Sequence, residues 1–195
     1  MFDIPPISAA PPASVDEALL QTTRLFSRAG LEGAEVAVTQ PAELGETLRG
    51  GCLEASIPMS SLEAVAGKAA ESLAASQGVK ISYTRLSLQN GAAGDLSLLL
   101  EMEVGVRVFG ATVTLRLSGV AEAAGGESIQ CRELQLDAGS GMFAGMAGAL
   151  IRPKLAALEG QSFNLSWIAG VPVRLVRLEC TGAAQDTLRI GLQFA

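Results

Sequence analysis

A stretch of alternating residues near the middle of the chain limits its fold more than any other feature. From Leu96 to Val108 every second residue is apolar, and the residues between are mostly polar, among them Glu101, Glu103 and Arg107. A period of two is typical of a β-strand with one face buried and the other in water. At about 3.4 Å per residue, such a strand is on the order of 40 Å long. An ordinary strand of about 5 to 6 residues is roughly 17 to 20 Å long. A strand of this length must curve or build an elongated body.

The segment that follows fits this strand as an antiparallel partner. A turn at Phe109 and Gly110 sets one register for both faces. On the apolar face, the pairs in this register are Val106 with Val113, Val104 with Leu115, and Met102 with Leu117. On the outer face, it places Glu103 opposite Arg116, which is a favourable cross-strand pair. The two faces therefore predict the same register.

Further strands and helices complete the predicted fold. Apolar parity changes near Thr84 and Arg85, and again between Cys131 and Leu134, which indicates β-bulges that bend a sheet. Helical spacing covers 15–29, about 60–76 and 141–158, the last interrupted by Pro153. We therefore predict an α+β fold: a long, strongly curved antiparallel sheet, a meander with bulges, wrapped on or packed against two to three helices.

The length of the chain predicts its domain organisation. At 195 residues it is expected to form one domain. Residues 1–13 are rich in Pro and Ala and form an arm, and residues 14–195 form the domain. Within it, residues 14–50 supply a helix, a short strand and a loop ahead of the long strands.

Few residues offer catalytic chemistry. The sequence has no histidine, which excludes Ser-His and Cys-His pairs and histidine metal sites. Its three cysteines are far apart and without CxxC spacing, and its glycines form neither GxGxxG nor a GxxxxGK[ST] loop. Glu101 and Glu103 share a strand face, but that face is the one predicted to lie in water. We therefore expect no catalytic residues, metal or cofactor, and a protein that is not an enzyme.

Charge and the N-terminus bear on partners and location. A net charge of −6 argues against nucleic acid, which requires a basic surface. Residues 141–195 are mildly basic, with 5 basic and 3 acidic residues, which suits contact with anionic headgroups. No apolar run reaches the roughly 18 residues of a membrane span, and Met1 to Pro12 do not resemble a secretory signal. We expect a cytoplasmic or membrane-peripheral protein, and export stays open because a protein whose signal has been removed would read the same.

Shape and hydrophobicity remain as the informative properties. The long sheet has one continuous apolar face, and the helices available to cover it are rich in Ala and Gly. Aromatic residues make up only 4% of the chain, so large side chains to fill a concavity are scarce. A groove between sheet and helix that accepts an apolar ligand is one interpretation. A core packed with the same Leu and Val residues is the other.

The order of elements resembles a known family. The segments that carry the resemblance are Val104 to Val120, Gly141 to Leu158 with Pro153, Val171-Pro-Val-Arg-Leu-Val-Arg-Leu178, and Leu188 to Phe194. From Ser60 to Ala195 the chain resembles the small bacterial LmeA-like phospholipid-binding domain of the tubular lipid-binding (TULIP) superfamily. The resemblance implies a curved sheet around a helix, with acyl chains bound in the apolar interior. It rests on alternation and turns rather than on a chemical motif.

The leading hypothesis is non-enzymatic binding, carriage or sensing of phospholipids or other apolar molecules. The residues expected to line the ligand site are Leu96, Leu98, Leu100, Met102, Val104, Leu115, Leu117, Phe143, Met146, Leu150 and Ile151. Arg152 and Lys154 are expected near the headgroup. Contact with a membrane surface, and a protein partner bound through 14–29, are left open.

Two alternatives remain. A structural or assembly subunit would use the same fold as a scaffold for a protein partner, with a filled core and an apolar patch around Leu19 and Phe26. A cyclase-like helix-grip enzyme would need polar groups inside the cavity, and the inward-facing positions offer almost none.

Overall fold

The structure is a computed structural model that describes residues 11–44, 47–75, 79–92, 94–108, 110–165 and 171–195. It confirms the α+β class. Across these ranges, three helices accompany nine strands, and the strands form two antiparallel sheets that do not close into a barrel. The sequence indicated the strands but not their division between two sheets.

The larger sheet, here called the long sheet, has the strand order β3-β4-β5-β6-β7. Its strands are β3 (Lys80–Asn90), β4 (Ser97–Val108), β5 (Ala111–Ala124), β6 (Ser128–Asp137) and β7 (Ser162–Asn164). The predicted register between β4 and β5 is confirmed, including Val104 with Leu115 and Glu103 with Arg116. The Arg116 Nε lies 3.4 Å from a Glu103 carboxylate oxygen.

Two bulges interrupt the long sheet. In β6, Glu133 has a φ of 56°, and the register with β5 shifts between Ser118 and Val120. This confirms the parity change predicted between Cys131 and Leu134. In β3 the register shifts between Ile81 and Tyr83, a little before the position predicted from the apolar pattern. Bulges of this kind increase the local twist and bend of a sheet.

The second sheet, here called the short sheet, has the strand order β1-β2-β9-β8. Its strands are β1 (Glu35–Gln40), β2 (Cys52–Pro58), β8 (Val173–Thr181) and β9 (Thr187–Phe194). β2 pairs with β9, so the beginning and the end of the chain meet in one sheet. One face is apolar, and the other carries Glu54, which pairs with Arg177 at 2.7 Å and with Arg189 at 3.6 Å.

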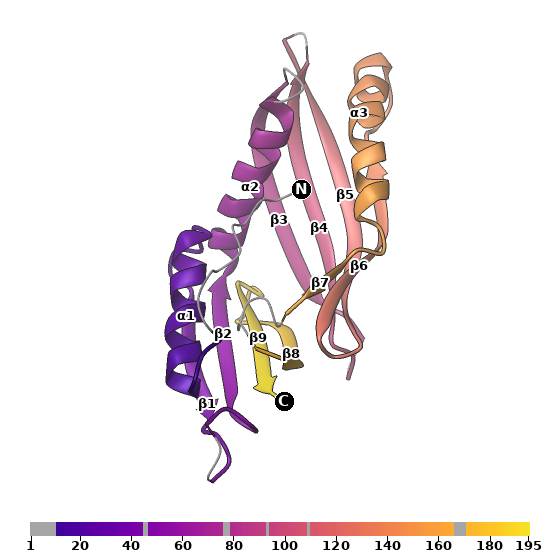
Figure 1. Cartoon of the computed structure of the whole chain (residues 1–195). Coiled ribbons are helices and arrows are strands. Elements are labelled where there is room, and N and C mark those ends of the chain that lie inside the picture. The colour runs from indigo at the N-terminus through magenta and orange to yellow at the C-terminus, as the bar shows by residue number, and fades with distance from the viewer. Residues whose placement is uncertain (1–10, 45–46, 76–78, 93, 109, 166–170) are drawn as a thin grey trace.

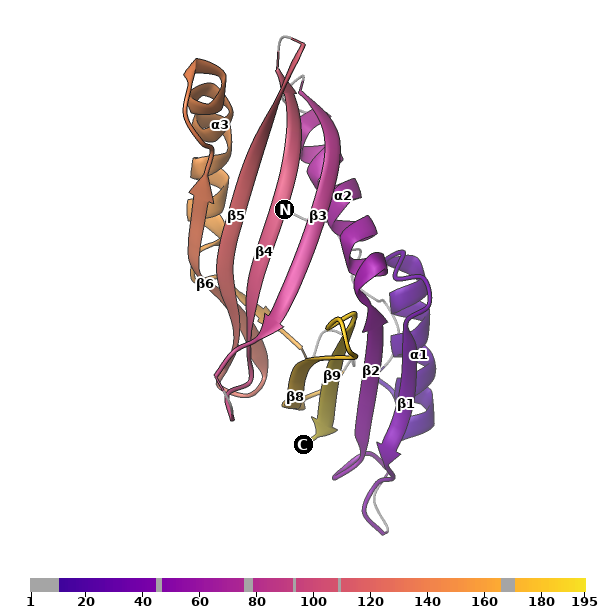
Figure 2. The ribbon, with the colours of Figure 1, turned by 180° about the vertical axis from the view of Figure 1, so that it is seen from behind.

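The three helices are α1 (Val15–Arg28), α2 (Met59–Ala75) and α3 (Met142–Leu158). α1 contacts β1 and β2 in the short sheet, and the Ser14 hydroxyl caps it by accepting from the Glu17 N–H at 3.2 Å. α2 contacts β3, and α3 contacts β4, β5 and β6. Figures 1 and 2 show α2 and α3 on one face of the long sheet, along its opposite edges, in an elongated molecule with the short sheet and α1 at one end.

Hydrogen bonds to the backbone of β8 join its outer edge to the end of β3 and to the turn between β5 and β6. The Asn90 side chain, at the end of β3, donates to the Cys180 carbonyl at 2.9 Å and accepts from the Cys180 N–H at 2.6 Å. At the other end of β8, the Leu175 N–H donates to the Gly126 carbonyl at 2.6 Å. Among the described strands, β8 pairs only with β9, so these bonds satisfy part of its other edge.

The apolar face of the long sheet is covered in two parts. The half nearest the short sheet belongs to the larger hydrophobic cluster, which also contains the apolar residues of α1, β2, β8 and β9. The other half belongs to the smaller cluster, built from Val104, Val106 and Leu115 on the sheet and Ala144 and Ala147 on α3. Pro153 lies inside α3, which continues through it to Leu158.

Candidate functional site

The structure divides the predicted lining residues between these two clusters. Leu98 belongs to the larger cluster, and Leu96 and Leu100 pack against it. Val104 and Leu115 belong to the smaller cluster, with Met102 and Ile151 packed against it. Leu117 is half-buried opposite Met102 and Leu136. Each set packs with its own cluster. That these residues line one ligand site stays a prediction.

The remaining predicted residues lie on α3. Met146 is 47% exposed. The side chains of Phe143 and Leu150 lie outside what the structure describes. Arg152 and Lys154 are both exposed.

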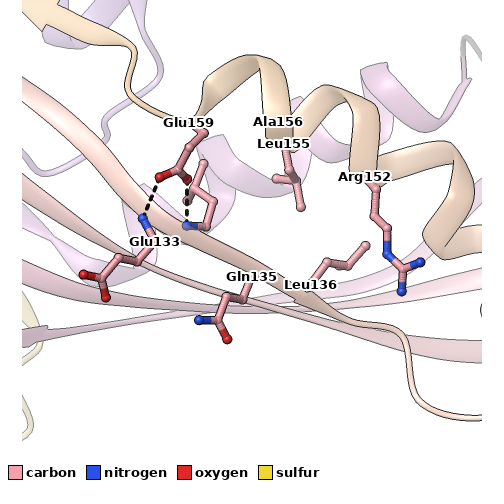
Figure 3. Close-up of a pocket in the computed structure, with 8 residues that line it drawn as sticks. Glu133, Gln135, Leu136, Arg152, Leu155, Ala156 and Glu159 are labelled. Carbon is pink, nitrogen blue, oxygen red and sulfur yellow. Dashed lines mark hydrogen bonds between the residues drawn. The ribbon is translucent and has the colours of Figure 1, made fainter.

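A groove of about 420 Å³ runs between α3 and β6. Its lining residues are Glu133, Leu134, Gln135 and Leu136 on β6, and Arg152, Leu155, Ala156 and Glu159 on or directly after α3. Figure 3 shows the two walls, with Arg152 and Leu155 extending from α3 toward β6 and with Glu133 and Gln135 pointing away from the helix. Of the residues predicted from the sequence, Arg152 lines this groove.

The helical wall follows from spacing. Residues 152, 155, 156 and 159 recur at the intervals that place side chains on one face of a helix, and this face looks toward β6. Leu155 is buried there, while Ala156 is small enough to leave the groove open.

The strand wall depends on the β6 bulge. The bulge brings Leu134 over Gly119 of β5, where a Cβ would lie only 2.6 Å from the Leu134 Cδ2 atom. Glycine at 119 therefore makes room for the Leu134 side chain, which lines the groove. Leu136 continues the apolar surface beyond it.

One end of the groove is fixed by a carboxylate. The Glu159 oxygens accept hydrogen bonds from the backbone N–H groups of Glu133 and Leu134, at 2.9 and 2.8 Å. These bonds satisfy two donors on the exposed edge of the bulge and tie the end of α3 to β6 (Figure 3). Because its oxygens are occupied in this way, Glu159 acts as a structural anchor.

The other end carries an unpaired cation. Within the described residues, the Arg152 guanidinium makes neither an ion pair nor a hydrogen bond. Its central carbon lies 3.9 Å from where a Cβ on Gly148 would be, which is an ordinary van der Waals distance. Lys154 is also exposed but does not line the groove. Arg152 is therefore the cation that lines the groove.

The cysteine thiols are poor nucleophiles. Burial raises the pKa of Cys52 and Cys180, and burial together with the nearby Glu159 carboxylate raises the pKa of Cys131. A thiol with a raised pKa stays protonated near neutral pH and reacts slowly. No group of three or more metal-ligating side chains occurs in the described part of the chain. Nor is any helix within the described ranges long and apolar enough to cross a membrane.

The apolar stripe of α1 is used inside the protein. Phe26 and Leu25 are buried in the larger cluster and Leu19 packs against it. Leu20 is 49% exposed on the opposite side of the helix. A protein partner bound through 14–29 stays a prediction.

Sequence reasoning missed most of the groove. Leu134 and Leu136 were recognised as strand residues, and Leu155 as part of the apolar side of its helix, but none was placed at a site. The signal that could have found them is the parity change in β6. It marks a bulge, and bulges are over-represented beside functional sites.

Comparisons with known proteins give little further information. No protein-family model matches the sequence, and no curated protein matches it significantly. Among solved structures, the chain is similar to the crystal structure of a lipopolysaccharide binding protein, with 13% sequence identity and a TM-score of 0.29. The match covers 86% of this chain and 41% of that one, so this chain spans less than half of that protein. A similarity this low assigns neither a family nor a function.

Proposed function

We propose that the protein binds phospholipids or other amphipathic apolar molecules in the groove between α3 and β6, without catalysing a reaction on them. The observation that carries the proposal is the combination of an apolar floor with one unpartnered cation. Leu134, Leu136 and Leu155 supply the floor, and Arg152 supplies the cation. Ligand sites are typically concave and mostly apolar, with a few polar groups that fix orientation.

The size of the groove limits what it can hold. A volume of about 420 Å³ lies in the lower part of the range of small-molecule sites. Burying a methylene contributes about 0.8 kcal/mol, so an acyl chain of about six methylenes, for example, would contribute roughly 5 kcal/mol before the entropy of association is subtracted. A chain of that length alone would bind weakly. We therefore expect the headgroup contact with Arg152 to decide which molecules bind.

Two variants test the role of the cation. Arg152→Gln and Lys154→Gln each remove one positive charge from the same helix, but only Arg152 lines the groove. We expect Arg152→Gln to weaken binding of a short-chain phosphatidylglycerol by about fivefold, the effect of a partly exposed ion pair of about 1 kcal/mol. Lys154→Gln should keep the affinity within about twofold. Native mass spectrometry with titrated lipid gives both values.

A third variant tests the apolar floor. Ala156→Trp places a large side chain in the groove and should reduce binding of phosphatidylglycerol and of phosphatidylcholine alike. Equal losses in the Arg152 and Lys154 variants would show that only the overall charge matters. Absence of lipid binding by the unmodified protein, or full binding by Ala156→Trp, would refute the proposal.

A further inference from the structure

We infer that a second apolar site, a cavity of about 190 Å³ between α1 and the short sheet, binds an uncharged hydrocarbon group. Thr22 and Phe26 line it from α1, and Leu53, Ala55, Ile190 and Leu192 line it from the sheet. It shares no lining residue with the groove beside α3. The inference therefore goes beyond the proposed function and does not depend on it.

The cavity follows from small side chains on both walls. Ala55 lies in the middle of β2, between Val36 of β1 and Ile190 of β9 in the hydrogen-bonded ladders. Across from the sheet, α1 presents Thr22, which is also short. Where a helix packs on a sheet through an alanine and a threonine, larger neighbours such as Phe26 hold the walls apart and leave a space between them.

The chemistry of the walls selects a ligand without charge. Thr22 is the only polar side chain in the lining. Its hydroxyl already donates to the Ala18 carbonyl of α1 at 2.9 Å. Around the cavity, the neighbouring strands pair from Glu35 with Ser56 to Val38 with Leu53 and from Leu53 with Leu192 to Ile57 with Leu188, and this pairing uses their backbone groups. A carboxylate or an ammonium group in this cavity would find no partner, and burying an unpaired charge is strongly unfavourable.

The size of the cavity fits a ring or a short alkyl chain. A dry, apolar cavity of about 150 Å³ engineered in another protein binds benzene, and this cavity is somewhat larger. Leu31 and Val36 line it and are only partly buried, so the cavity is not sealed on their side. The hydrocarbon group has two sources: a free small molecule, or the end of an acyl chain that belongs to a lipid.

The experiment uses toluene as the probe and the methyl resonances of Ala55 and Ile190 as the readout. We expect toluene to shift both resonances in the full-length protein, in a saturable manner. Dihexanoyl phosphatidylglycerol is then added to the toluene complex. Reversal of the toluene shifts identifies the acyl-chain end as a ligand of the cavity, and retention of the shifts identifies free small hydrocarbons as its ligands. An absence of toluene-induced shifts would overturn the inference.

A matched pair of variants locates the site. Ala55→Leu fills the cavity, whereas Ala37→Leu adds the same atoms at an exposed position of the neighbouring strand β1. We expect Ala55→Leu to lose toluene affinity at least tenfold, and Ala37→Leu to keep it. If Ala55→Leu does not fold, judged by circular dichroism, the smaller Ala55→Val replaces it and should weaken binding in the same direction. Unchanged toluene affinity in a folded Ala55 variant would overturn the inference.

The two sites are separable by this design. Arg152→Gln and Ala156→Trp alter the groove beside α3 and should leave toluene binding in the second cavity unchanged. In the unmodified protein, toluene binding without lipid binding would therefore refute the proposed function alone, and lipid binding without toluene binding would refute this inference alone.

Discussion

Asn90 joins the two sheets, and its removal is expected to destabilise the protein by about 1 to 2 kcal/mol. The amide of Asn90 makes two hydrogen bonds to the backbone of Cys180, at 2.9 and 2.6 Å. In Asn90→Ala, the N–H and the carbonyl of a buried residue both lose their partner. A hydrogen bond contributes about 0.5 to 1.5 kcal/mol net, and an unsatisfied buried group costs about 1 to 3 kcal/mol. Because Asn90 itself is exposed, water replaces part of the loss, which places the estimate near the lower values.

Urea denaturation measures this change. In thermal unfolding, the same loss of 1 to 2 kcal/mol lowers the melting temperature of a protein of this size by roughly 2 to 8 °C. Gln89→Ala is the control, because Gln89 is exposed beside Asn90 and makes no side-chain hydrogen bond among the described residues. It should change stability by less than about 0.5 kcal/mol.

Hydrogen exchange at one amide separates this mechanism from a general loss of packing. The Cys180 N–H should exchange faster in Asn90→Ala, while amides of β4 and β5 change only through the global stability. If Asn90→Ala keeps the stability of the unmodified protein and the protection of the Cys180 amide, the reasoning about this edge is wrong.

Two further predictions concern the groove and the thiols. Gly119→Ala should destabilise the protein by about 1 kcal/mol because the added methyl displaces Leu134. Gly145→Ala has open space around the added methyl and should stabilise α3 by up to about 1 kcal/mol. Equal denaturation midpoints for the two variants would contradict this. Burial and the Glu159 carboxylate raise the pKa of Cys131 in the folded protein, so the unfolded chain releases this proton first and stability should fall as the pH rises above about 8.5. Iodoacetamide should accordingly modify Cys131 faster in concentrated urea than in buffer at the same pH, and equal rates would show that the folded state does not protect it.

The long sheet was largely predictable because two faces of the same strands constrain it. The apolar face of β4 and the charged pair of Glu103 with Arg116 each require one register, and the structure has that register. In β6, the parity change located the bulge at Glu133 for the same reason. In β3, the register shifts between Ile81 and Tyr83, at the start of the strand. Few residues precede the shift, so the apolar pattern placed the bulge slightly too late along the chain.

The division into two sheets was beyond local patterns. Alternation shows which side of a strand is buried but does not name its partner. The short sheet depends on pairing β2 with β9, from Cys52 with Gln193 to Pro58 with Thr187. Such a contact between distant segments leaves no periodic signal in either of them.

The candidate site was predictable only in part. Charge and position on a helix identified Arg152, which lines the groove. The sequence could not separate Arg152 from Lys154, because the difference between them is the direction in which each side chain leaves α3. Leu134 and Leu155 meet only after the β6 bulge and the Glu159 hydrogen bonds bring α3 against the strand edge.

Because the two hydrophobic clusters are separate, α1 and α3 pack in different parts of the molecule. α3 packs in the smaller cluster, where Ala144 and Ala147 lie with Val104 and Leu115. α1 and the short sheet pack in the larger cluster. Detachment of α3 would thus expose the apolar surface of the smaller cluster and leave the larger cluster packed.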